Sequence, residues 1–466
     1  MPKALVLAGT HSGCGKTSLT LGLVRALARR GLTVQPFKTG PDFIDPGLHA
    51  AAAGRPSHNL DTWMMPESAV CELFARHAQV ADIAVVEGVM GLFDGRDGLD
   101  EQGSTAHLAE LLGLPVVLVV DAGSQARSIA ALVHGFTTFD SELPLAGVLL
   151  NRVGSERHET ILRQALTVAD AVPVLGCLRR SEALALPARH LGLVTVEDAV
   201  AENAAGLEAT LNALADWVER SVDIPALLAS LPELPQLKVL RAADSPPSVA
   251  PSVRLGLARD RAFCFVYEEN LRLLEAAGAE IVPFSPLAAA DLPPNLDGLL
   301  LPGGYPELTA RQLSANKPML QAIRAFCASG KPVWAECGGY MYLMRELIDV
   351  EGRAWPLCGV VPARAHMTGR RAALGYRTAR TLRPGPLGPA GTVLRGHEFH
   401  YSQAEMDEQH AEPRAAWSLI ASDGACSDEG WCCGSVIGGY FHMHLASNPE
   451  VAQAFVTACR KGGGEG

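Results

Sequence analysis

The strongest constraint on the fold is residues 9–17, GTHSGCGKT, which follow an apolar run and precede a stretch with helical spacing. Glycines let the backbone turn its N–H groups toward an anion, and the positive end of the following helix favours phosphate at the same point. The lysine would meet outer phosphate oxygens, and the hydroxyl that follows it would bind Mg²⁺. The segment therefore predicts a nucleotide site formed by Thr10, Gly13, Gly15, Lys16, Thr17 and Ser18.

Short apolar runs alternate with helical patterns from the start of the chain to about residue 196. Alternation of this kind indicates a mostly parallel sheet that helices cover on both faces. The predicted strands are 4–8, 33–37, 83–86, 115–120, 145–150 and 172–177, and the predicted helices are 18–29, 105–112 and 126–135.

Prolines and small residues without periodicity interrupt this pattern at 231–252. Such a stretch is typical of a linker, although surface loops of one large domain have a similar composition. A second alternating unit follows, with strands near 254–258, 281–284, 299–301 and 333–335. We expect an α/β protein with an N-terminal P-loop domain on a doubly wound parallel sheet (1–230), a linker (231–252) and a C-terminal α/β domain (253–466).

Polar residues follow the predicted strands at the sheet edge where the glycine loop lies. Glu87 ends the third strand, Lys38 and Asp42 follow the second, and Asn151 follows the fifth. A carboxylate there can hold Mg²⁺, a lysine can offset charge on a phosphorylated intermediate, and an asparagine can contact an adenine edge. The alternative interpretation is that these polar residues are solvated strand ends or parts of ordinary turns with no role in binding. The prediction is a metal site at Thr17, Asp42 and Glu87, with Lys38 and Asn151 at the nucleotide.

Residues 331–343, KPVWAECGGYMYL, carry the second reactive feature. An apolar strand runs into a Gly-Gly turn at Cys337, and helical spacing follows over residues 340–347. A cysteine on such a turn is held exposed, with N–H groups and a helix end that favour its thiolate, and Gly338 lets a carbonyl approach closely. A lone cysteine is more often a buried structural residue. The prediction of a nucleophile therefore depends on two further segments.

These segments lie on either side of the cysteine in the sequence. Residues 299–307, LLLPGGYPE, end a strand in a loop where Gly304 can aim an N–H at an oxyanion. Residues 438–445, GGYFHMHL, place His442 and His444 on one face if they form a strand, and either is a candidate base. The set resembles a class I glutamine amidotransferase domain, although a Glu usually stands where this chain has His444. The resemblance implies these catalytic residues: Cys337, His442, His444, Gly304 and Gly338.

Further motifs extend the resemblance over nearly the whole chain. They are KTGPDFIDP at 38–46, EGVMGLFDG at 87–95, PGGYPE at 302–307, AECGGY at 335–340 and GHEFHYS at 396–402. With the late HMH they resemble the cobyrinic acid a,c-diamide synthase family. The resemblance implies amidation of the a and c acetates of cobyrinic acid in cobalamin synthesis, driven by ATP, Mg²⁺ and glutamine through acyl phosphates. It also implies substrate contacts by Asp42, Asp45, Asp94 and Glu398.

Related activities stay open at this point. Relatives amidate hydrogenobyrinic acid, which lacks cobalt, or nickel–sirohydrochlorin, and cobyric acid synthase shares both domains but amidates other side chains. A P-loop partitioning or switch ATPase is a more distant alternative, yet its signature lysine would stand at His11. Dethiobiotin synthesis would leave the predicted glutaminase unexplained, because carboxylation needs no ammonia.

Composition argues against several other partners. A formal net charge of −11 is unfavourable for nonspecific nucleic-acid binding, and no apolar run is long enough to span a bilayer. The 11 cysteines show no paired C-x-x-C spacing, which favours a reducing cytoplasm over a disulfide framework or a zinc knuckle. The expected partners are glutamine and a corrinoid, and a homodimer is a further candidate assembly.

Overall fold

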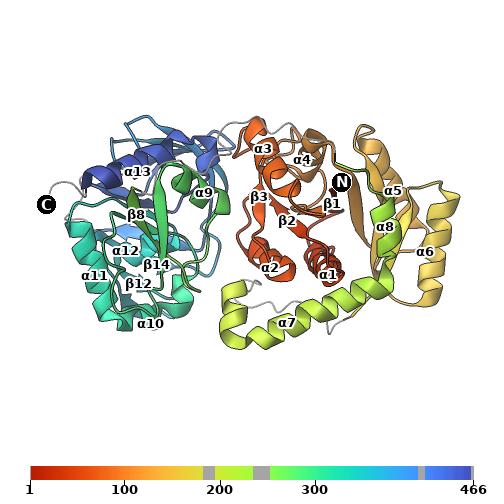
Figure 1. The fold of residues 1–466 in the computed structure, drawn as a ribbon, viewed down its shortest axis with the longest axis horizontal. Helices are drawn as coiled ribbons and strands as arrows, with labels where there is room; N and C mark the ends of the chain where they lie inside the picture. The colour runs from red at the N-terminus through yellow and green to blue at the C-terminus, as the bar shows by residue number, and fades with distance from the viewer. Residues whose placement is uncertain (1, 182–194, 235–251, 408–414, 463–466) are drawn as a thin grey trace. The chain divides into compact units, whose positions relative to one another are not determined.

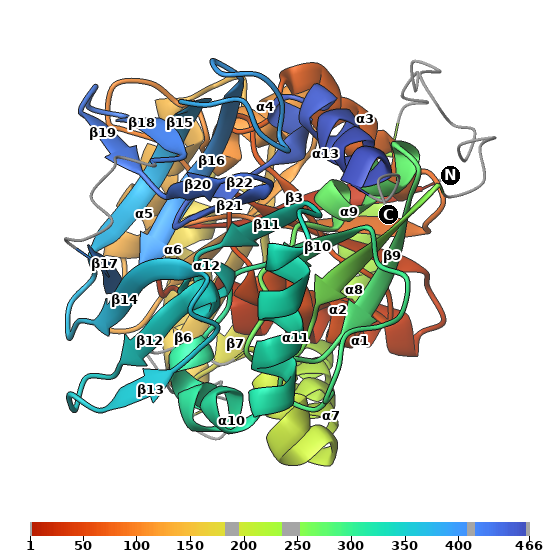
Figure 2. The same ribbon diagram turned by 90° about the vertical axis from the view of Figure 1, so that its left-hand side faces the viewer.

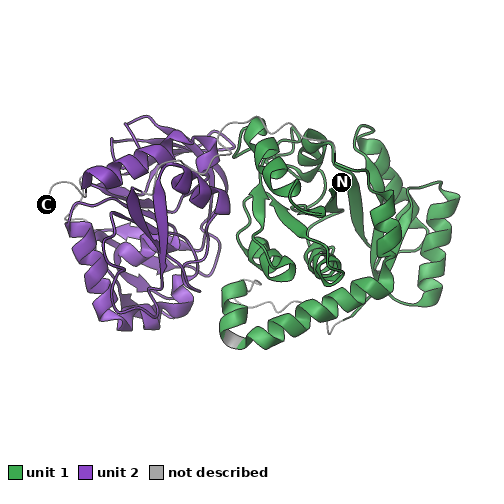
Figure 3. Ribbon diagram, viewed as in Figure 1, with its two compact units in different colours: residues 1–242 green, residues 243–466 purple. Residues whose placement is uncertain are grey.

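The computed structural model describes residues 2–181, 195–234, 252–407 and 415–462. The chain forms two compact units, Met1–Ala242 and Ala243–Gly466 (Figure 3). Most of the predicted linker at 231–252 lies outside the described residues. Within the described ranges, no helix is both long and apolar enough to cross a membrane.

Unit 1 is built on a seven-stranded parallel sheet with the order β3-β2-β4-β1-β5-β6-β7. Helices α1, α2 and α7 lie on one side of it and α3 and α4 on the other (Figure 1), which confirms the predicted doubly wound fold. The elements are β1 (Lys3–Gly9), α1 (Lys16–Arg29), β2 (Val34–Thr39), α2 (Ile44–Ala53), β3 (His58–Leu60), α3 (Glu67–Ala78), β4 (Ile83–Glu87), α4 (Thr105–Leu112), β5 (Val116–Asp121), α5 (Ser128–Phe139), β6 (Leu145–Val153), α6 (Glu156–Val168), β7 (Val174–Arg179), α7 (Val196–Ser221) and α8 (Ile224–Ser230).

Local chemistry explains where these elements begin and end. Helix α4 has the predicted bounds because the Ser104 hydroxyl accepts from the N–H of His107 and Gly113 ends the helix at a φ of 63°. Helix α1 begins two residues before its predicted start, directly after the left-handed Gly15. Strand β6 continues past its predicted end, so Asn151 lies within the strand and not after it.

The segment at the C-terminal end of unit 1 packs back against its first strand, β1. The Lys3 ammonium donates to the carbonyl oxygens of Leu228 at 2.5 Å and Leu231 at 3.0 Å. The N–H of Leu234 donates to the carbonyl of Pro2 at 2.8 Å. Buried residues of α7 and α8 pack with those of α1 and the central strands in one core. Unit 1 is therefore complete only when the segment after α7 is in place.

Unit 2 contains a six-stranded sheet, β20-β21-β11-β10-β8-β9, in which all pairs but β20–β21 are parallel. A four-stranded sheet (β13-β12-β14-β17) and a five-stranded sheet (β19-β18-β15-β16-β22) accompany it (Figure 2). The elements are β8 (Val253–Ala258), α9 (Glu268–Ala276), β9 (Ala279–Phe284), β10 (Gly298–Leu301), α10 (Ala310–Ala315), α11 (Lys317–Ala328), β11 (Val333–Glu336), α12 (Gly338–Leu343), β12 (Met344–Ile348), β13 (Ala354–Pro356), β14 (Val361–Met367), β15 (Ala373–Thr381), β16 (Val393–His400), β17 (Ser402–Met406), β18 (Trp417–Ala421), β19 (Cys426–Glu429), β20 (Trp431–Cys433), β21 (Val436–Gly439), β22 (His442–Met443) and α13 (Glu450–Gly462), with short 3₁₀ turns η3 (Pro306–Thr309) and η5 (Leu445–Ser447).

The predicted helical stretch over residues 340–347 is wrong in its second half. Helix α12 ends at Leu343, and Met344 is extended with a ψ of 171°. Strand β12 starts there and pairs with β13 and β14. Pairing with distant strands outweighs a local helical pattern of this length, since short helices depend on tertiary contacts.

Alanine substitutions at two glycines, one in α1 and one in α5, test the packing of α1 on α7. A Cβ on Gly22 would meet the carbonyl oxygen of Leu214 at 2.6 Å and a methyl of Val218 at 2.7 Å. Gly22→Ala should lower the free energy of unfolding by about 1–3 kcal/mol through overpacking. The control is Gly135→Ala in α5, where a Cβ meets nothing within 4 Å. It should be neutral or stabilise by up to about 1 kcal/mol. Equal effects of the two changes in urea unfolding would contradict the packing.

Candidate active sites

The loop between β1 and α1 depends on glycine at three positions. Gly13 and Gly15 have φ angles of 81° and 98°, in the left-handed region that a side chain disfavours. A Cβ on Gly9 would meet the sulfur of Cys14 at 2.4 Å and the Lys16 side chain at 2.9 Å. The early glycine of the motif therefore makes room for the lysine of the same loop.

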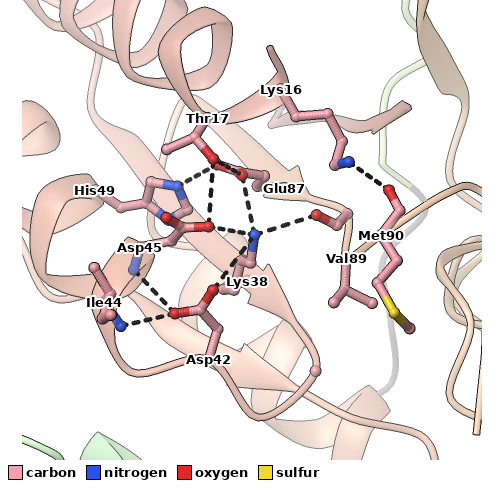
Figure 4. Close-up of polar contacts among 12 residues, drawn as sticks. Lys16, Thr17, Lys38, Asp42, Ile44, Asp45, His49, Glu87, Val89 and Met90 are labelled. Atoms are coloured by element: carbon pink, nitrogen blue, oxygen red, sulfur yellow. Dashed lines mark hydrogen bonds and ion pairs between the residues drawn. The ribbon is translucent and has the colours of Figure 1, made fainter. Parts of the chain in front are cut away.

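Lys16 lies across this loop (Figure 4). Its ammonium donates to the backbone carbonyls of His11, at 3.3 Å, and of Met90. Burial lowers the pKa of Lys16, because an ammonium loses solvation there. A phosphate oxyanion is a stronger hydrogen-bond acceptor than a carbonyl. A phosphate bound in the loop can therefore replace these carbonyls as the partner of the Lys16 ammonium.

Side chains from several elements meet beside the loop at the carboxyl ends of the strands (Figure 4). The Thr17 hydroxyl donates to Glu87 Oε1 at 2.7 Å and lies 3.4 Å from Asp45 Oδ2. Lys38 Nζ lies 2.5 Å from Asp45 and 3.0 Å from Glu87, with a carboxylate oxygen of Asp42 at 4.0 Å. The structure thus gathers in one cluster the three residues of the predicted metal site with two further predicted residues: Thr17, Asp42 and Glu87 with Lys38 and Asp45.

Burial and neighbouring charges shift the pKa values of the side chains in this cluster. Burial alone would lower the pKa of Lys38, but Asp45, Glu87 and Asp42 outweigh it and raise that pKa. Burial would raise the pKa of Glu87, yet Lys38 and His49 hold it below its usual range. Burial and the nearby Asp42 raise the pKa of Asp45. The carboxylate and hydroxyl oxygens of the cluster are hard donors of the kind that Mg²⁺ prefers. Metal binding by Thr17, Asp42 and Glu87 stays a prediction.

His49 is a member of the cluster that the sequence analysis missed. Its Nε2 lies 2.6 Å from Glu87 Oε2, and its Nδ1 lies 3.4 Å from the hydroxyl of Ser57. A fully buried histidine held in this way fixes the direction of the carboxylate. The available signal was its position four residues after Asp45, which places both on one face of a helix.

Asn151 contacts the phosphate loop itself. Its Nδ2 donates to the carbonyl of Cys14 at 2.8 Å, and its Oδ1 accepts from the N–H of Arg152 at 2.8 Å. The Arg152 guanidinium donates to the carbonyl of Gly13 at 2.8 Å. A Cβ on Gly15 would lie only 2.1 Å from Asn151 Nδ2. The amide therefore braces the loop, and its contact with adenine stays a prediction.

The remaining predicted residues of unit 1 lie around the same sheet edge. Asp42 Oδ1 accepts from two N–H groups in the first turn of α2, at 2.7 and 3.1 Å. Asp94 is exposed and accepts from an N–H of its own loop at 2.7 Å. The Thr10 hydroxyl lies 3.0 Å from Nδ1 of His11, and Ser18 is half-buried in the first turn of α1. Their roles toward nucleotide and substrate stay predictions.

Cys337 joins β11 to α12 through the predicted sharp turn. Its φ of 42° and ψ of −101° are sparsely populated for a residue with a side chain. Its N–H donates to the carbonyl of Gly439 at 2.7 Å, and its carbonyl accepts from Met341 at 2.9 Å. A Cβ on Gly339 would lie 2.0 Å from the carbonyl oxygen of Leu301. The surrounding backbone therefore holds the cysteine in the geometry of a nucleophile elbow.

The electrostatics of the thiol differ from the sequence prediction. Burial raises the pKa of Cys337 well above its usual range, Glu307 raises it further, and the N–H of Gly338 lowers it. The expectation of an exposed cysteine is thus wrong, because Cys337 is buried, and this burial disfavours the expected thiolate. Helix α12 has only six residues, and its N–H groups do not offset the desolvation of a thiol that is 4% exposed. A base must take the proton when the sulfur attacks.

Gly304 and Gly338 lie against each other beside the elbow. A Cβ on Gly338 would meet the backbone nitrogen of Gly304 at 3.0 Å. Gly304 has a φ of 155°, and a Cβ there would lie 2.1 Å from the carbonyl of Ala262. Only glycine brings the two backbones this close. The juxtaposition suits an oxyanion site, which stays a prediction.

His442 packs against both of these segments. A Cβ on Gly303 would lie 2.4 Å from its Cε1. Its Nδ1 lies 3.6 Å from Oε2 of Glu336, the residue before Cys337. The structure therefore brings the loop, the residue before Cys337 and this imidazole together. The role of His442 as the base stays a prediction.

His444 has different surroundings. Strand β22 ends at Met443, so the two histidines do not share a strand face as expected. The His444 ring lies 4.8 Å from the ring of Tyr267, and its Nδ1 accepts from the N–H of Ala446 at 3.3 Å. Burial lowers the pKa of His444 to about 3. This imidazole is neutral and serves as a cap for η5.

Glu398 in β16 lies among basic groups. Its Oε2 is 2.6 Å from Arg377 Nε, and its Oε1 is 3.7 Å from His400 Nε2. Burial would raise the pKa of Glu398, but His400 and Arg377 outweigh it and lower that pKa. A contact with glutamine would compete with these partners, and it stays a prediction.

Together the two sites define a class of protein: a nucleotide-binding unit joined to a glutamine amidotransferase unit. Residues 5–194 match the CobQ/CobB/MinD/ParA nucleotide binding domain. Residues 254–450 match the CobB/CobQ-like glutamine amidotransferase domain. The predicted pair of domain types is therefore confirmed.

Similarity to individual proteins narrows the class. The chain is 48% identical to cobyrinate a,c-diamide synthase of Syntrophotalea carbinolica over 98% of both chains. It is 44% identical to hydrogenobyrinate a,c-diamide synthase of Streptomyces coelicolor, over 98% of this chain and 97% of that one. The Salmonella typhimurium cobyrinate a,c-diamide synthase is 42% identical over 98% of both chains. The chain belongs to the cobyrinate/hydrogenobyrinate a,c-diamide synthase family of glutamine-hydrolysing ligases.

The burial of Cys337 leads to a prediction about its reactivity. Iodoacetamide reacts with thiolates, so at neutral pH it should label the exposed Cys426 at least about tenfold faster than Cys337. Peptide mass spectrometry over a time course measures both rates, with the buried Cys358 as a slow reference. Labelling of Cys337 as fast as Cys426 would contradict the raised pKa of the thiol.

Proposed function

We propose that this chain amidates the a and c acetate carboxylates of cobyrinic acid, with ammonia from glutamine and activation by ATP, in cobalamin biosynthesis. The observation that carries the proposal is the presence in one chain of both halves of the reaction. Lys16 and the Thr17–Glu87 pair offer a phosphate and metal site, and the Cys337 elbow offers a nucleophile beside His442. The nucleotide half would activate the substrate carboxylate, and the glutaminase half would supply the ammonia that reacts with it.

The residues of unit 1 position and neutralise charge. ATP with Mg²⁺ would supply the phosphoryl group that turns a carboxylate into an acyl phosphate. The loop N–H groups and Lys16 would hold the phosphates, and Thr17, Asp42 and Glu87 would hold the metal. Lys38 is fixed by Asp45 and Glu87, so its charge is preorganised beside the transferring group. Asp42, Asp45 and Asp94 would orient the carboxylate-rich macrocycle.

The residues of unit 2 release ammonia. His442 accepts the thiol proton as the Cys337 sulfur attacks the carboxamide carbon of glutamine. The N–H groups at Gly304 and Gly338 receive the charge that develops on the carboxamide oxygen. His442 then gives the proton to the leaving nitrogen. Water hydrolyses the thioester, and glutamate leaves with the thiol restored.

Replacing the nucleophile separates the two halves. Cys337→Ala should reduce glutamine-driven amidation by on the order of 1000-fold or more. Amidation driven by ammonium chloride should stay close to that of the wild type, because unit 1 is unchanged. Mass spectrometry of the corrinoid products measures both, with Cys426→Ala as the control. Loss of both activities at an unchanged unfolding temperature would argue against separate sites.

Removing the loop lysine tests the nucleotide half. Lys16→Ala should abolish corrinoid amidation with either nitrogen source, since both require the activated carboxylate. The exposed Lys461 supplies the control variant Lys461→Ala. Persistence of ATP-dependent amidation in Lys16→Ala would disprove the phosphate assignment. Parallel assays with cobyrinic and hydrogenobyrinic acids decide which corrinoid is the substrate.

A further inference from the structure

The residue two positions after His442 differs from the one usual in class I glutamine amidotransferases. A glutamate two residues after the histidine would carry a negative charge toward it, but this chain has His444 there. His444 is neutral and caps η5 through its Nδ1. A neutral ring cannot stabilise the imidazolium that forms when His442 takes the proton of the thiol.

Glu336 lies where such a charge is needed. Its Oε2 is 3.6 Å from Nδ1 of His442, and its Oε1 accepts from the N–H of Met443 at 3.1 Å. The exposed fractions of Glu336 and His442 are 5% and 1%. At this separation the two groups form an ion-pair contact and not a hydrogen bond, and catalytic hydrogen bonds are often long before substrate binds. One oxygen therefore fixes the carboxylate to β22 while the other faces the imidazole.

The direction of the Glu336 side chain follows from its strand. Val333 and Ala335 pack in the same core as residues of α12, whereas Trp334 packs with Phe441 and Met443. Because side chains alternate along β11, Glu336 shares the face of Trp334 and points toward the histidine strand. The nucleophile follows at the next position, so the strand delivers both groups.

Two rings that pack on His442, those of His397 and Phe265, carry no negative charge. The His397 ring is stacked on it with centroids 5.0 Å apart, and the Phe265 ring lies at 6.4 Å. Burial, with His442 and His444 nearby, holds the pKa of His397 well below its usual range. His397 is thus neutral, and its Nδ1 lies 3.1 Å from the Tyr267 hydroxyl.

We propose that Glu336, the residue before the nucleophile, is the positioning carboxylate that orients His442 and stabilises its protonated form. The inference deepens the proposed function and rests on it. Glu336 gives up no proton. It holds the Nδ1–H of His442, so that Nε2 takes the proton from the Cys337 sulfur and passes it to the departing ammonia.

Two substitutions at Glu336 separate charge from structure. Glu336→Gln keeps an oxygen for the N–H of Met443 but loses the charge, whereas Glu336→Asp keeps the charge on a shorter side chain. We expect kcat for glutamine hydrolysis to fall about 100-fold in Glu336→Gln with KM changed less than about threefold, and to fall only about tenfold in Glu336→Asp. Both variants should retain ammonium-driven amidation.

The control is Glu280→Gln in β9, an exposed glutamate paired with Arg254 at 3.1 Å, which should behave as wild type. A purely structural role predicts the opposite order, with Glu336→Gln more active than Glu336→Asp, and that order would overturn the inference. A parallel loss of ammonium-driven activity would also overturn it. Glutamate release is measured without corrinoid, so failure of the proposed corrinoid reaction would leave this comparison intact.

Discussion

The buried ammonium of Lys38 is the interaction on which the site in unit 1 depends. It is 3% exposed and lies against carboxylates from two other elements, Asp45 in α2 and Glu87 in β4. Removing one partner of such a group costs about 3–5 kcal/mol, because a charge is left buried without compensation. The carboxylate of Glu87 in turn accepts a hydrogen bond from the Thr17 hydroxyl and contacts the imidazole of His49. The ends of β2 and β4 and the starts of α1 and α2 are thus linked through one group of charged side chains.

Unit 2 builds its site in a different way. Its fixed points are close backbone approaches at Gly304, Gly338 and Gly339, where no side chain fits, and a strained φ at Cys337. Burial disfavours the thiolate of Cys337, whereas Lys16 and Lys38 of unit 1 lie against oxygen atoms. In the proposed reaction, charge is thus preorganised in the nucleotide half and created during turnover in the glutaminase half.

The sequence predicted the parallel sheet, the phosphate loop and the elbow because each has a local signature: alternation, glycines before a lysine, and a cysteine in a Gly-Gly turn. It did not predict His49 or the contact of Glu336 with His442, since these depend on which side chains meet across strands distant in sequence. Strand β12 was mistaken for helix because its partners lie further along the chain. The prediction of an exposed cysteine failed because burial cannot be judged from one turn. Features with a local sequence signature were thus easier to predict than contacts between side chains from segments distant in sequence.

The closure of unit 1 over its first strand has a consequence for how the protein is made. Lys3 is held by carbonyls of Leu228 and Leu231, and Pro2 by Leu234. During translation β1 therefore waits for more than two hundred later residues before its last hydrogen bonds form. These later residues become available when the proline-rich segment 231–252 leaves the ribosome, before the glutaminase half has been fully synthesised. The nucleotide half can finish folding with no competition from the second set of apolar strands.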